Sequence, residues 1–390
     1  MSETQDTNSL PLVVADRLQD WYTKHGRTLP WRTNLSPYRV WVSEIMLQQT
    51  RVVQAMDYYT CFLDVFPDVE TLASADFSAV AKVWEGLGYY RRARNMHRAA
   101  KLIVEECGGV FPTTYQGLRL LPGVGAYTAG AIASVCYNLP TPAVDGNVLR
   151  VVSRLLALEA DIAASTTIKL VHSILEPLYH YVSNRNTLTQ SLMELGAIVC
   201  VPNTEPHCKA CPLRPMCRAY ALEATLSFPI KSAKKEKVNE KLTVFVLEGK
   251  GQYAGKYLVE KPKTTGLLAG MHTFIHCSGH LEQAEALAYL AQKVSDNKLN
   301  DTPPSDTATH VGSSMQPNDI PSNDTSLRKD LGSITCTHTA TAKHVFTHKV
   351  WHMQVYYVQL EGAMQNLSST QQWVHLQEVA IPTAFKKLIL

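Results

Sequence analysis

The sequence predicts two domains of different class, an all-α domain over residues 9–228 and an α+β domain over residues 242–390. Apolar residues recur at helical spacing throughout the first part. After residue 242, short runs rich in β-branched and apolar residues are separated by turn residues. Residues 229–241 are polar and basic, and we expect them to form a linker. A chain of 390 residues is long enough to bury a core in each domain.

Composition narrows the class of protein. The formal net charge of +3 is weak for a nucleic-acid-binding protein, and residues 1–230 carry 20 basic and 20 acidic side chains. No apolar run has the length of a membrane-spanning helix, and the polar start is unlike a signal peptide. We therefore expect a soluble cytoplasmic protein, associated with the nucleoid in a bacterium, with no membrane partner. Nine cysteines do not suggest a disulfide scaffold, but four of them cluster, which suggests a metal.

The first helices can be placed in order. Residues 12–25 predict an amphipathic helix that ends at Gly26, and residues 29–32 predict a loop with an aromatic and a cation. Pro37 is suited to the start of a helix, and a long helical pattern continues over residues 38–66.

Glu44 and Gln48 lie four residues apart in that pattern and should share a face. Glu44 has the apolar neighbours Val40, Trp41 and Ile45, and apolar surroundings raise the pKa of a carboxyl. Such a group can donate a proton near neutral pH. The alternative is an exposed glutamate on an amphipathic helix.

The turn at residues 84–90 offers an apolar wedge and an aromatic plate beside a basic helix. Wedges and plates of this kind fill the gap when a base leaves the stack of a duplex. The alternative is a helix corner with core aromatics. The basic side chains that follow predict a patch for a polyanion, or else a solvated helix face; they are Arg91, Arg92, Arg94, Arg98 and Lys101.

Residues 120–150 contain a glycine hairpin, with Gly123 and Gly125, and then an alanine-rich helix. The amides of a helix start form an anion site that suits a phosphate. Asp145 precedes another apolar helical run, so the helix dipole should keep its carboxylate ionised. An ordinary turn and a simple helix N-cap are the alternatives for these two features.

Helices are expected at residues 148–158, 166–182 and 190–199. A cysteine cluster with the spacing C-x7-C-x2-C-x5-C follows; its members are Cys200, Cys208, Cys211 and Cys217. Four thiolates in one loop suit an iron–sulfur cluster or a tetrahedral zinc ion. Zinc sites more often have two C-x2-C pairs, and this loop has one.

The second domain should contain strands at residues 242–247 and 257–260, a helix at 281–294, further strands at 343–347 and 351–358, and a short helical tail. Residues 295–333 are rich in Ser, Thr, Asn, Asp and Pro, a composition that predicts disorder or a long insertion.

Together, the segments LPWR, WVSEIMLQQT, WEGLGYY, LPGVGAYTAGA and PAVDGNV and the cysteine cluster resemble the adenine DNA glycosylases of the MutY type, in the helix-hairpin-helix/Gly-Pro-Asp superfamily. The match runs in order over nearly all of residues 27–220. It implies a two-lobed, all-α helix-hairpin-helix glycosylase domain with an iron–sulfur loop, followed by a Nudix-like domain. It also implies a monomer that removes adenine mispaired with 8-oxoguanine or guanine in double-stranded DNA.

The resemblance assigns roles to residues. Glu44 would be the general acid/base, and Asp145 would stabilise the sugar cation. The adenine pocket would be lined by Trp31, Arg32, Leu47, Tyr127, Asn147 and Gln190. Contacts to DNA would come from Gln48, Gln49, Thr50, Arg51, Leu87, Gly88, Tyr89, Gly123 and Gly125. The four cysteines would hold one [4Fe-4S] cluster, although seven residues rather than the family's usual six separate the first two.

The chemistry agrees with these roles. Adenine leaves readily only when its ring is protonated, which a neutral Glu44 can do. The sugar then resembles an oxocarbenium ion, which the charge of Asp145 stabilises. Lyase-type relatives carry a lysine nucleophile where this chain has Tyr127, and a phenol cannot form a Schiff base. We therefore predict base removal without efficient strand cleavage.

In the second domain, residues 266–270 resemble the family's glycine loop. No glutamate-rich Nudix helix is found, since residues 279–293 offer only Glu282 and Glu285, so we expect no nucleotide hydrolysis. The loop that would recognise 8-oxoguanine is Phe346, Thr347 and His348, with a strand edge as the alternative.

Two further functions compete with this one. A non-catalytic, cluster-containing DNA-damage binder is disfavoured by the presence of both Glu44 and Asp145. A lyase-type glycosylase for oxidised pyrimidines is disfavoured by Tyr127 and by the added domain.

Overall fold

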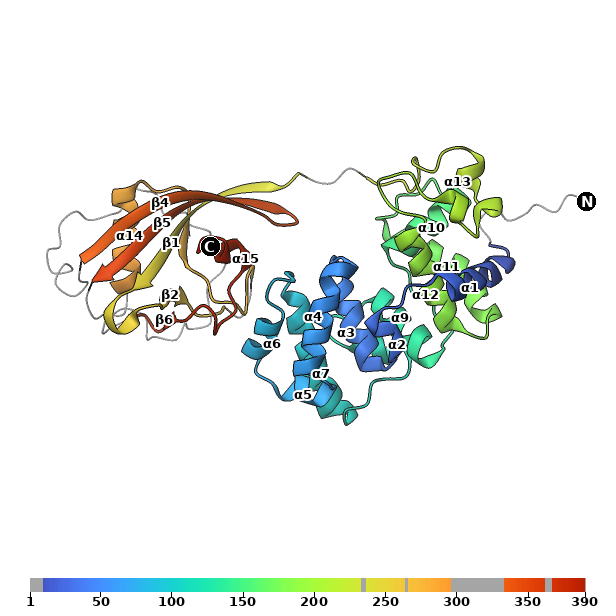
Figure 1. The fold of residues 1–390 in the computed structure, drawn as a ribbon, viewed down its shortest axis with the longest axis horizontal. Coiled ribbons are helices and arrows are strands. Elements are labelled where there is room, and N and C mark those ends of the chain that lie inside the picture. Colours follow the sequence, from blue (N-terminus) through green and yellow to red (C-terminus); the bar gives the residue numbers. More distant parts are fainter. Residues whose placement is uncertain (1–9, 233–235, 264–265, 296–332, 362–366, 390) are drawn as a thin grey trace, which may run out of the picture. The chain divides into compact units, whose positions relative to one another are not determined.

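The computed structural model describes residues 10–232, 236–263, 266–295, 333–361 and 367–389. The chain divides into two compact units, Met1–Lys234 and Lys235–Leu390 (Figure 1). The first unit is helical and the second is built on a sheet, which confirms the predicted fold class. The segment predicted to be disordered or inserted lies outside the described residues, apart from its two ends. No helix in the described part of the chain is both long enough and apolar enough to span a membrane.

The helices of the first unit are α1 (Val13–His25), α2 (Pro30–Thr33), α3 (Pro37–Leu47), α4 (Val52–Val65), α5 (Val69–Ser74), α6 (Phe77–Val83), α7 (Arg91–Cys107), α8 (Tyr115–Leu120), α9 (Ala126–Tyr137), α10 (Gly146–Leu156), α11 (Ser165–Tyr181), α12 (Arg185–Ile198) and α13 (Arg218–Ala221). One core joins α1 to α10, α11 and α12 and includes Leu18, Val152 and Leu175. Elsewhere in this unit α3 packs against α4 and α9, and α5 packs against α7.

The long helical pattern predicted over residues 38–66 is divided into two helices in the structure. Helix α3 ends at Leu47, α4 begins at Val52, and Gln49 between them has a φ of 59°. The guanidinium of Arg92, on α7, donates to the carbonyls of Ile45, Met46 and Gln48. A cation therefore satisfies carbonyls that a continuing helix would have bonded to its own amides.

Two other boundaries differ from the prediction. The predicted loop at residues 29–32 contains the short helix α2, with Pro30 at its first position, where a missing N–H costs nothing. The helix expected from residue 190 begins earlier, because Asn184 caps α12 by accepting a hydrogen bond from the Thr187 amide, 3.0 Å.

The second unit contains β1 (Val238–Gly249), β2 (Tyr257–Glu260), β3 (Ile275–Ser278), α14 (Gln283–Ser295), β4 (Ser333–Val345), β5 (Lys349–Glu361), β6 (Gln371–Val374) and α15 (Thr383–Lys386). The strand order is β4-β5-β1-β2-β6, and β3 pairs with β1. Strands β1 and β5 are parallel, and the other pairs are antiparallel.

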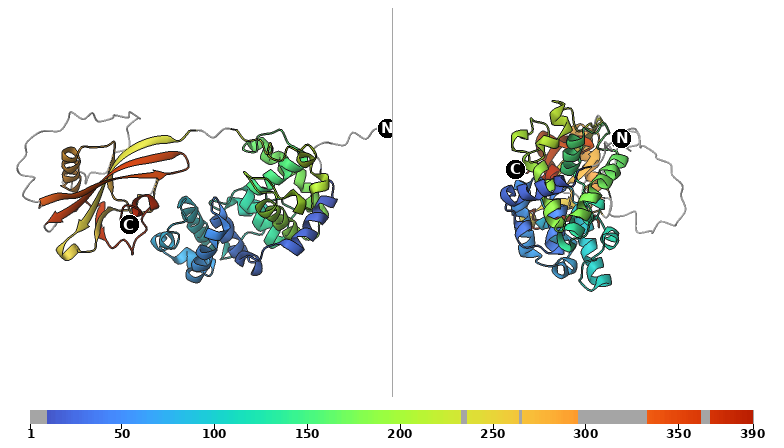
Figure 2. Two further views of the ribbon diagram at one scale, coloured as in Figure 1. Left: turned by 45° about the horizontal axis from the view of Figure 1, so that its top comes forward. Right: turned by 90° about the vertical axis from the view of Figure 1, so that its right-hand side faces the viewer.

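The two faces of this sheet are covered differently. Helix α14 packs on Phe245, Leu247 and Tyr356, whereas the C-terminal segment, with Phe385, packs on the opposite face (Figure 2). The expected linker is shorter than predicted, because β1 already pairs with β5 from Val238 onward. Strands β3 and β6 were not predicted; each has only four residues, too few to show a clear alternation.

Candidate active site

The glycine hairpin joins α8 to α9 and turns sharply at Gly123, whose φ is 79°. An added Cβ at this glycine would lie 2.7 Å from the Cβ of Asn95, on α7, so both the backbone conformation and the space require glycine. Gly125 is the N-cap of α9, and no side chain caps this helix.

One pocket collects most of the residues predicted to form the site. The predicted residues that line it are Trp31, Arg32, Glu44, Leu47, Gln48, Gln49, Thr50, Gly123, Gly125, Tyr127, Asp145, Asn147 and Gln190. They come from α2, α3, the α3–α4 break, the hairpin, α9, the start of α10 and α12. Residues far apart in the sequence therefore meet around one cavity.

Glu44 lies near the end of α3 and is half-buried. The hydroxyl of Tyr127 donates a hydrogen bond to its Oε2. Burial raises the pKa of Glu44 to about 7, and the charge of Asp145 raises it further, while the Tyr127 hydrogen bond and Arg32 lower it. The carboxyl can therefore be protonated near neutral pH and can also act as a base.

Asp145 is the N-cap of α10. Its Oδ1 accepts from the Val148 amide at 2.8 Å, and its Oδ2 accepts from Asn147 Nδ2 at 2.7 Å. We expected the helix start to hold this carboxylate ionised. The structure corrects the balance of effects: burial raises the pKa of Asp145, although the hydrogen bonds from Val148 and Asn147 and the charge of Arg150 lower it.

Arg150, which is buried, fixes the start of α10 in place. Its Nη2 donates to Asn147 Oδ1 at 2.9 Å and to the Gly196 carbonyl at 2.8 Å, and its Nε donates to the Cys200 carbonyl at 2.7 Å. The side chain that holds Asp145 is thereby linked to α12 and to the cysteine loop.

Sequence reasoning missed Glu194, which also lines the pocket and whose side chain is fully buried, 0% exposed. It accepts from Arg27 at 2.6 and 2.9 Å and from Arg32 at 2.8 Å. Burial would raise the pKa of Glu194, but these hydrogen bonds outweigh burial and lower it to about 2. An acidic residue within the apolar pattern of α12, together with two arginines beside Trp31, was the available signal.

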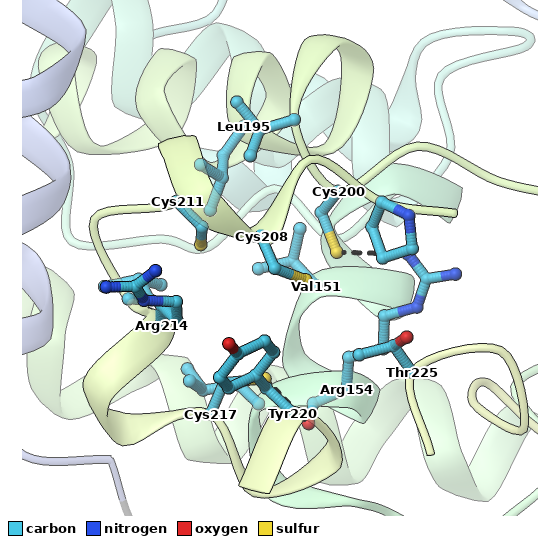
Figure 3. Close-up of a pocket in the computed structure, with 14 residues that line it drawn as sticks. Val151, Arg154, Leu195, Cys200, Cys208, Cys211, Arg214, Cys217, Tyr220 and Thr225 are labelled. Atoms are coloured by element: carbon cyan, nitrogen blue, oxygen red, sulfur yellow. Dashed lines mark hydrogen bonds between the residues drawn. The ribbon is translucent and has the colours of Figure 1, made fainter. Parts of the chain in front are cut away.

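The four cysteines of the predicted cluster line a single cavity together with Val151, Arg154 and Leu195 (Figure 3). Arg154 Nη1 lies 3.3 Å from Cys200 Sγ and donates to the Val201 carbonyl at 2.9 Å. Among the described residues, no three His, Cys, Asp or Glu side chains lie close enough together to hold a single metal ion. Four thiols facing one largely apolar cavity fit the donor set of an iron–sulfur cluster.

Comparison with known proteins places the chain in a family. A model described as HhH-GPD superfamily base excision DNA repair protein matches residues 42–177, and a NUDIX domain model matches residues 244–390. The adenine DNA glycosylase of Rattus norvegicus is 33% identical over 431 residues, covering 95% of this chain and 76% of the rat protein. That of Buchnera aphidicola subsp. Baizongia pistaciae is 35% identical over 267 residues, covering 67% and 73%.

The chain belongs to the adenine DNA glycosylases. It is a base-excision repair enzyme that hydrolyses N-glycosyl bonds, as predicted. Among solved structures, a thermostable thymine-DNA glycosylase matches with a TM-score of 0.49 and 23% identity, over 57% of this chain and 100% of that one.

In this glycosylase the two side chains of the 84–90 turn that were predicted to contact the duplex, the apolar Leu87 and the aromatic Tyr89, differ in exposure. Leu87 is only 5% exposed, whereas Tyr89 is 48% exposed. Tyr89, Gln48, Gln49 and Gly123 line a second pocket beside the hairpin, whereas Leu87, Gly88 and Arg51 line neither pocket. Tyr89 is therefore the side chain that this turn presents to the surface.

The predicted basic patch is also smaller than the sequence suggested. Arg92 is engaged with the carbonyls at the end of α3, and the guanidinium of Arg94 lies over Phe77, 5.1 Å from the ring centroid. The other three cations of this stretch are exposed. Two of the five predicted cations thus have structural partners within the protein.

The predicted recognition loop of the glycosylase, residues 346–348, is the turn between β4 and β5. Phe346 packs against His344 and Trp351, with ring centroids 4.6 and 4.8 Å apart, and Thr347 and His348 are exposed. The Lys237 Nζ donates to the Phe346 carbonyl at 2.9 Å. The aromatic side chain anchors the turn, and the two polar side chains face solvent.

Proposed function

We propose that this glycosylase removes adenine paired with 8-oxoguanine or guanine in duplex DNA, by hydrolysis without strand cleavage. The observation that carries the proposal is that Glu44, with a pKa of about 7, and Asp145 line one pocket. Two carboxyl groups in different environments are the requirement for glycosidic hydrolysis through a cationic transition state.

The residues support the following sequence of steps. A flipped adenine enters the pocket, and the protonated Glu44 donates its proton to the ring, so that the base leaves neutral. The carboxylate of Asp145, held by Val148 and Asn147, stabilises the positive charge that develops on the sugar. Glu44, now ionised, accepts a proton from the attacking water and is restored.

The absence of strand cleavage is supported by Tyr127. Burial raises the pKa of its phenol well above the ordinary value, so it stays protonated and donates to Glu44. None of the described residues that line this pocket is a lysine, so it offers no amine for a Schiff base. Incubation with the enzyme alone should leave the DNA strand intact. Heating the product in alkali afterwards should break the strand.

The cysteine cavity supports one resident [4Fe-4S] cluster. Cys200, Cys208, Cys211 and Cys217 would hold it, and the cluster would supply four iron–sulfur bonds that close the loop over residues 200–217. Iron and acid-labile sulfide should each reach about four per chain, as four thiolates and one cubane require. Loss of iron in Cys208→Ser, with the exposed Cys61→Ser as control, would support the assignment; full iron content in Cys208→Ser would contradict it.

Duplex contacts are proposed for the α3–α4 break, the glycine hairpin and the exposed Tyr89. For the opposite base, the exposed Thr347 and His348 at the tip of the β4–β5 turn supply hydroxyl and imidazole groups. In Thr347→Ala, the preference for 8-oxoguanine over guanine opposite the adenine should fall. An unchanged preference would remove this turn from the recognition of the opposite base.

The deciding experiment is single-turnover adenine release from duplexes with A opposite 8-oxoguanine or guanine. Glu44→Gln and Asp145→Asn should each lose at least about 100-fold, the usual contribution of acid–base and electrostatic groups. Glu105→Gln, an exposed glutamate of α7, is the matched control. A folded, DNA-binding wild-type protein that releases no adenine would instead indicate a non-catalytic damage binder.

A further inference from the structure

The positive charge of this chain is unevenly distributed. Residues 1–230 carry equal numbers of basic and acidic side chains, so the whole formal excess of +3 lies in the remainder of the chain. Two of these charges, Lys231 and Lys234, belong to the helical unit, which contains the pocket and has a formal net charge of only +2. The second unit, Lys235–Leu390, has 15 basic and 14 acidic side chains, and some of its basic side chains lie together on the sheet.

Three basic side chains form a row across β4, β5 and β1, near the β4–β5 turn. His352 on β5 pairs with Lys241 on β1 and with Lys343 on β4. Residues paired across neighbouring strands point to the same face, so all three side chains project from one side of the sheet. Both lysines are exposed, and His280, also exposed, reaches the same position by donating to the His352 carbonyl at 2.9 Å. We call the two lysines, which flank His352, the cationic row; the His352 imidazole bonds Asn239 Oδ1 at 2.9 Å.

The cationic row is on the face that α14 covers only in part. Alternation along β1 places Lys241 on the same face as Phe245 and Leu247, which α14 covers. The cover ends at Thr243, whose hydroxyl bonds the Gly279 carbonyl and the Leu281 amide at 3.0 and 2.9 Å. Between Lys241 and the β4–β5 turn, Asn239, Lys343 and Val345 on this face are exposed.

The charge of the row is not neutralised within the described residues. Neither lysine forms a hydrogen bond or ion pair through its ammonium group there, whereas Lys349, on the same hairpin, pairs with Glu240 at 2.6 Å. The acidic side chains Glu282 and Glu285 lie at the start of α14, beyond Leu281. Lys241 and Lys343 carry like charges on one face of the sheet, on either side of β5, so an anion outside the protein that contacts both would reduce their repulsion.

We propose that the cationic row binds the sugar–phosphate backbone of the duplex, a contact that rests on the proposed function and adds a second DNA-binding surface to it. Lys241 and Lys343 lie on strands that are separated by two inter-strand distances, roughly 10 Å. Over that length, one strand of DNA carries about three phosphates. Lys343 precedes the 346–348 turn by three residues, roughly 10 Å along the strand. A duplex held at this turn therefore lies within reach of the row.

The test is the salt dependence of binding to a duplex with 2′-fluoro-2′-deoxyadenosine opposite 8-oxoguanine, whose fluorine suppresses formation of the sugar cation. Each phosphate contact contributes about 0.9 to the slope of log K against log salt concentration. Lys241→Gln/Lys343→Gln should reduce the slope by roughly 1.8 and raise Kd at low salt, while Lys241→Arg/Lys343→Arg keeps the wild-type slope. Removing the unpaired charges should also leave Tm unchanged or slightly higher.

Lys256→Gln/Lys293→Gln is the matched control, because it removes the same charge elsewhere in this unit: Lys256 directly precedes β2, and Lys293 lies on α14, where its carbonyl accepts from Gln371 of β6. The proposal is overturned if Lys241→Gln/Lys343→Gln keeps the wild-type salt slope. It is also overturned if the control variant reduces the slope by the same amount. Adenine release by the wild-type protein from an ordinary A:8-oxoguanine duplex, measured in parallel, reports on the proposed function separately. If that activity is present and the row variant binds like wild type, only this inference fails.

Discussion

Tyr127 controls the proton of Glu44, and Tyr127→Phe tests this relation directly. The phenol donates to the Glu44 carboxylate, and this hydrogen bond lowers the pKa of Glu44 against the effect of burial. Phenylalanine keeps the ring and removes only the donor. A hydrogen bond to a charged group contributes about 1.5–3 kcal/mol, and one pKa unit corresponds to about 1.4 kcal/mol. The pKa of Glu44 should therefore rise by roughly one to two units.

The assay is the single-turnover rate of adenine release between pH 5 and 10, with protein in excess over DNA. In the proposed mechanism the protonated Glu44 donates to the base, so the wild-type rate should decline above a pH near 7, the pKa of that group. In Tyr127→Phe the decline should move to higher pH by roughly one to two units, whatever happens to the maximal rate. A decline at the wild-type position, or at lower pH, would refute the reasoning. Tyr181→Phe, an exposed tyrosine of α11, should leave the profile unchanged.

Three further predictions concern stability. Glu44 has a folded pKa of about 7 against an ordinary value of 4.5, so its contribution to stability is present below pH 4.5 and is lost as pH rises to 7. Glu44→Gln should therefore raise the free energy of unfolding at pH 8, by up to about 3 kcal/mol, and not at pH 4.5. Glu194→Gln should lower the free energy of unfolding by about 3 kcal/mol, because two arginines lose their buried partner. In the wild type, the stability that Glu194 adds above pH 4.5 should be lost as pH falls toward 2. Gly196→Ala should cost about 1–3 kcal/mol by overpacking, because its Cβ would lie 2.6 Å from that of Asn147, and it should also slow adenine release.

Urea unfolding measures all three, and each has a control. The exposed Glu176→Gln should change stability little at either pH. Gly146→Ala adds a Cβ that meets nothing within 4 Å, so it should unfold at nearly the wild-type urea concentration. Equal stability of Glu44→Gln and wild type at pH 8 would show that burial does not raise the pKa of Glu44. A neutral Gly196→Ala would show that α12 can move away from the start of α10.

Sequence alone was sufficient for the features that local patterns carry. The helical spacing of the first part and the strand runs of the second gave the fold class, and Asp145 was recognised as a residue at a helix start because capping depends on its immediate neighbours. The motif residues around Glu44 and Tyr127 also line one pocket, although their proposed roles remain predictions. The same holds for the four cysteines, whose spacing indicated a common ligand and which line one cavity.

Tertiary structure decided whatever depends on groups distant in the chain. Arg92 ends α3 from 47 residues away, and Glu194 holds Arg27 from 167 residues away, so neither the helix break nor the buried ion pair has a local signature. Leu87 and Tyr89 are two residues apart, yet the folded domain buries one and leaves the other exposed. The pKa of Asp145 follows the same rule: its helix start is visible in the sequence, but the burial that outweighs it exists only once the surrounding helices have assembled.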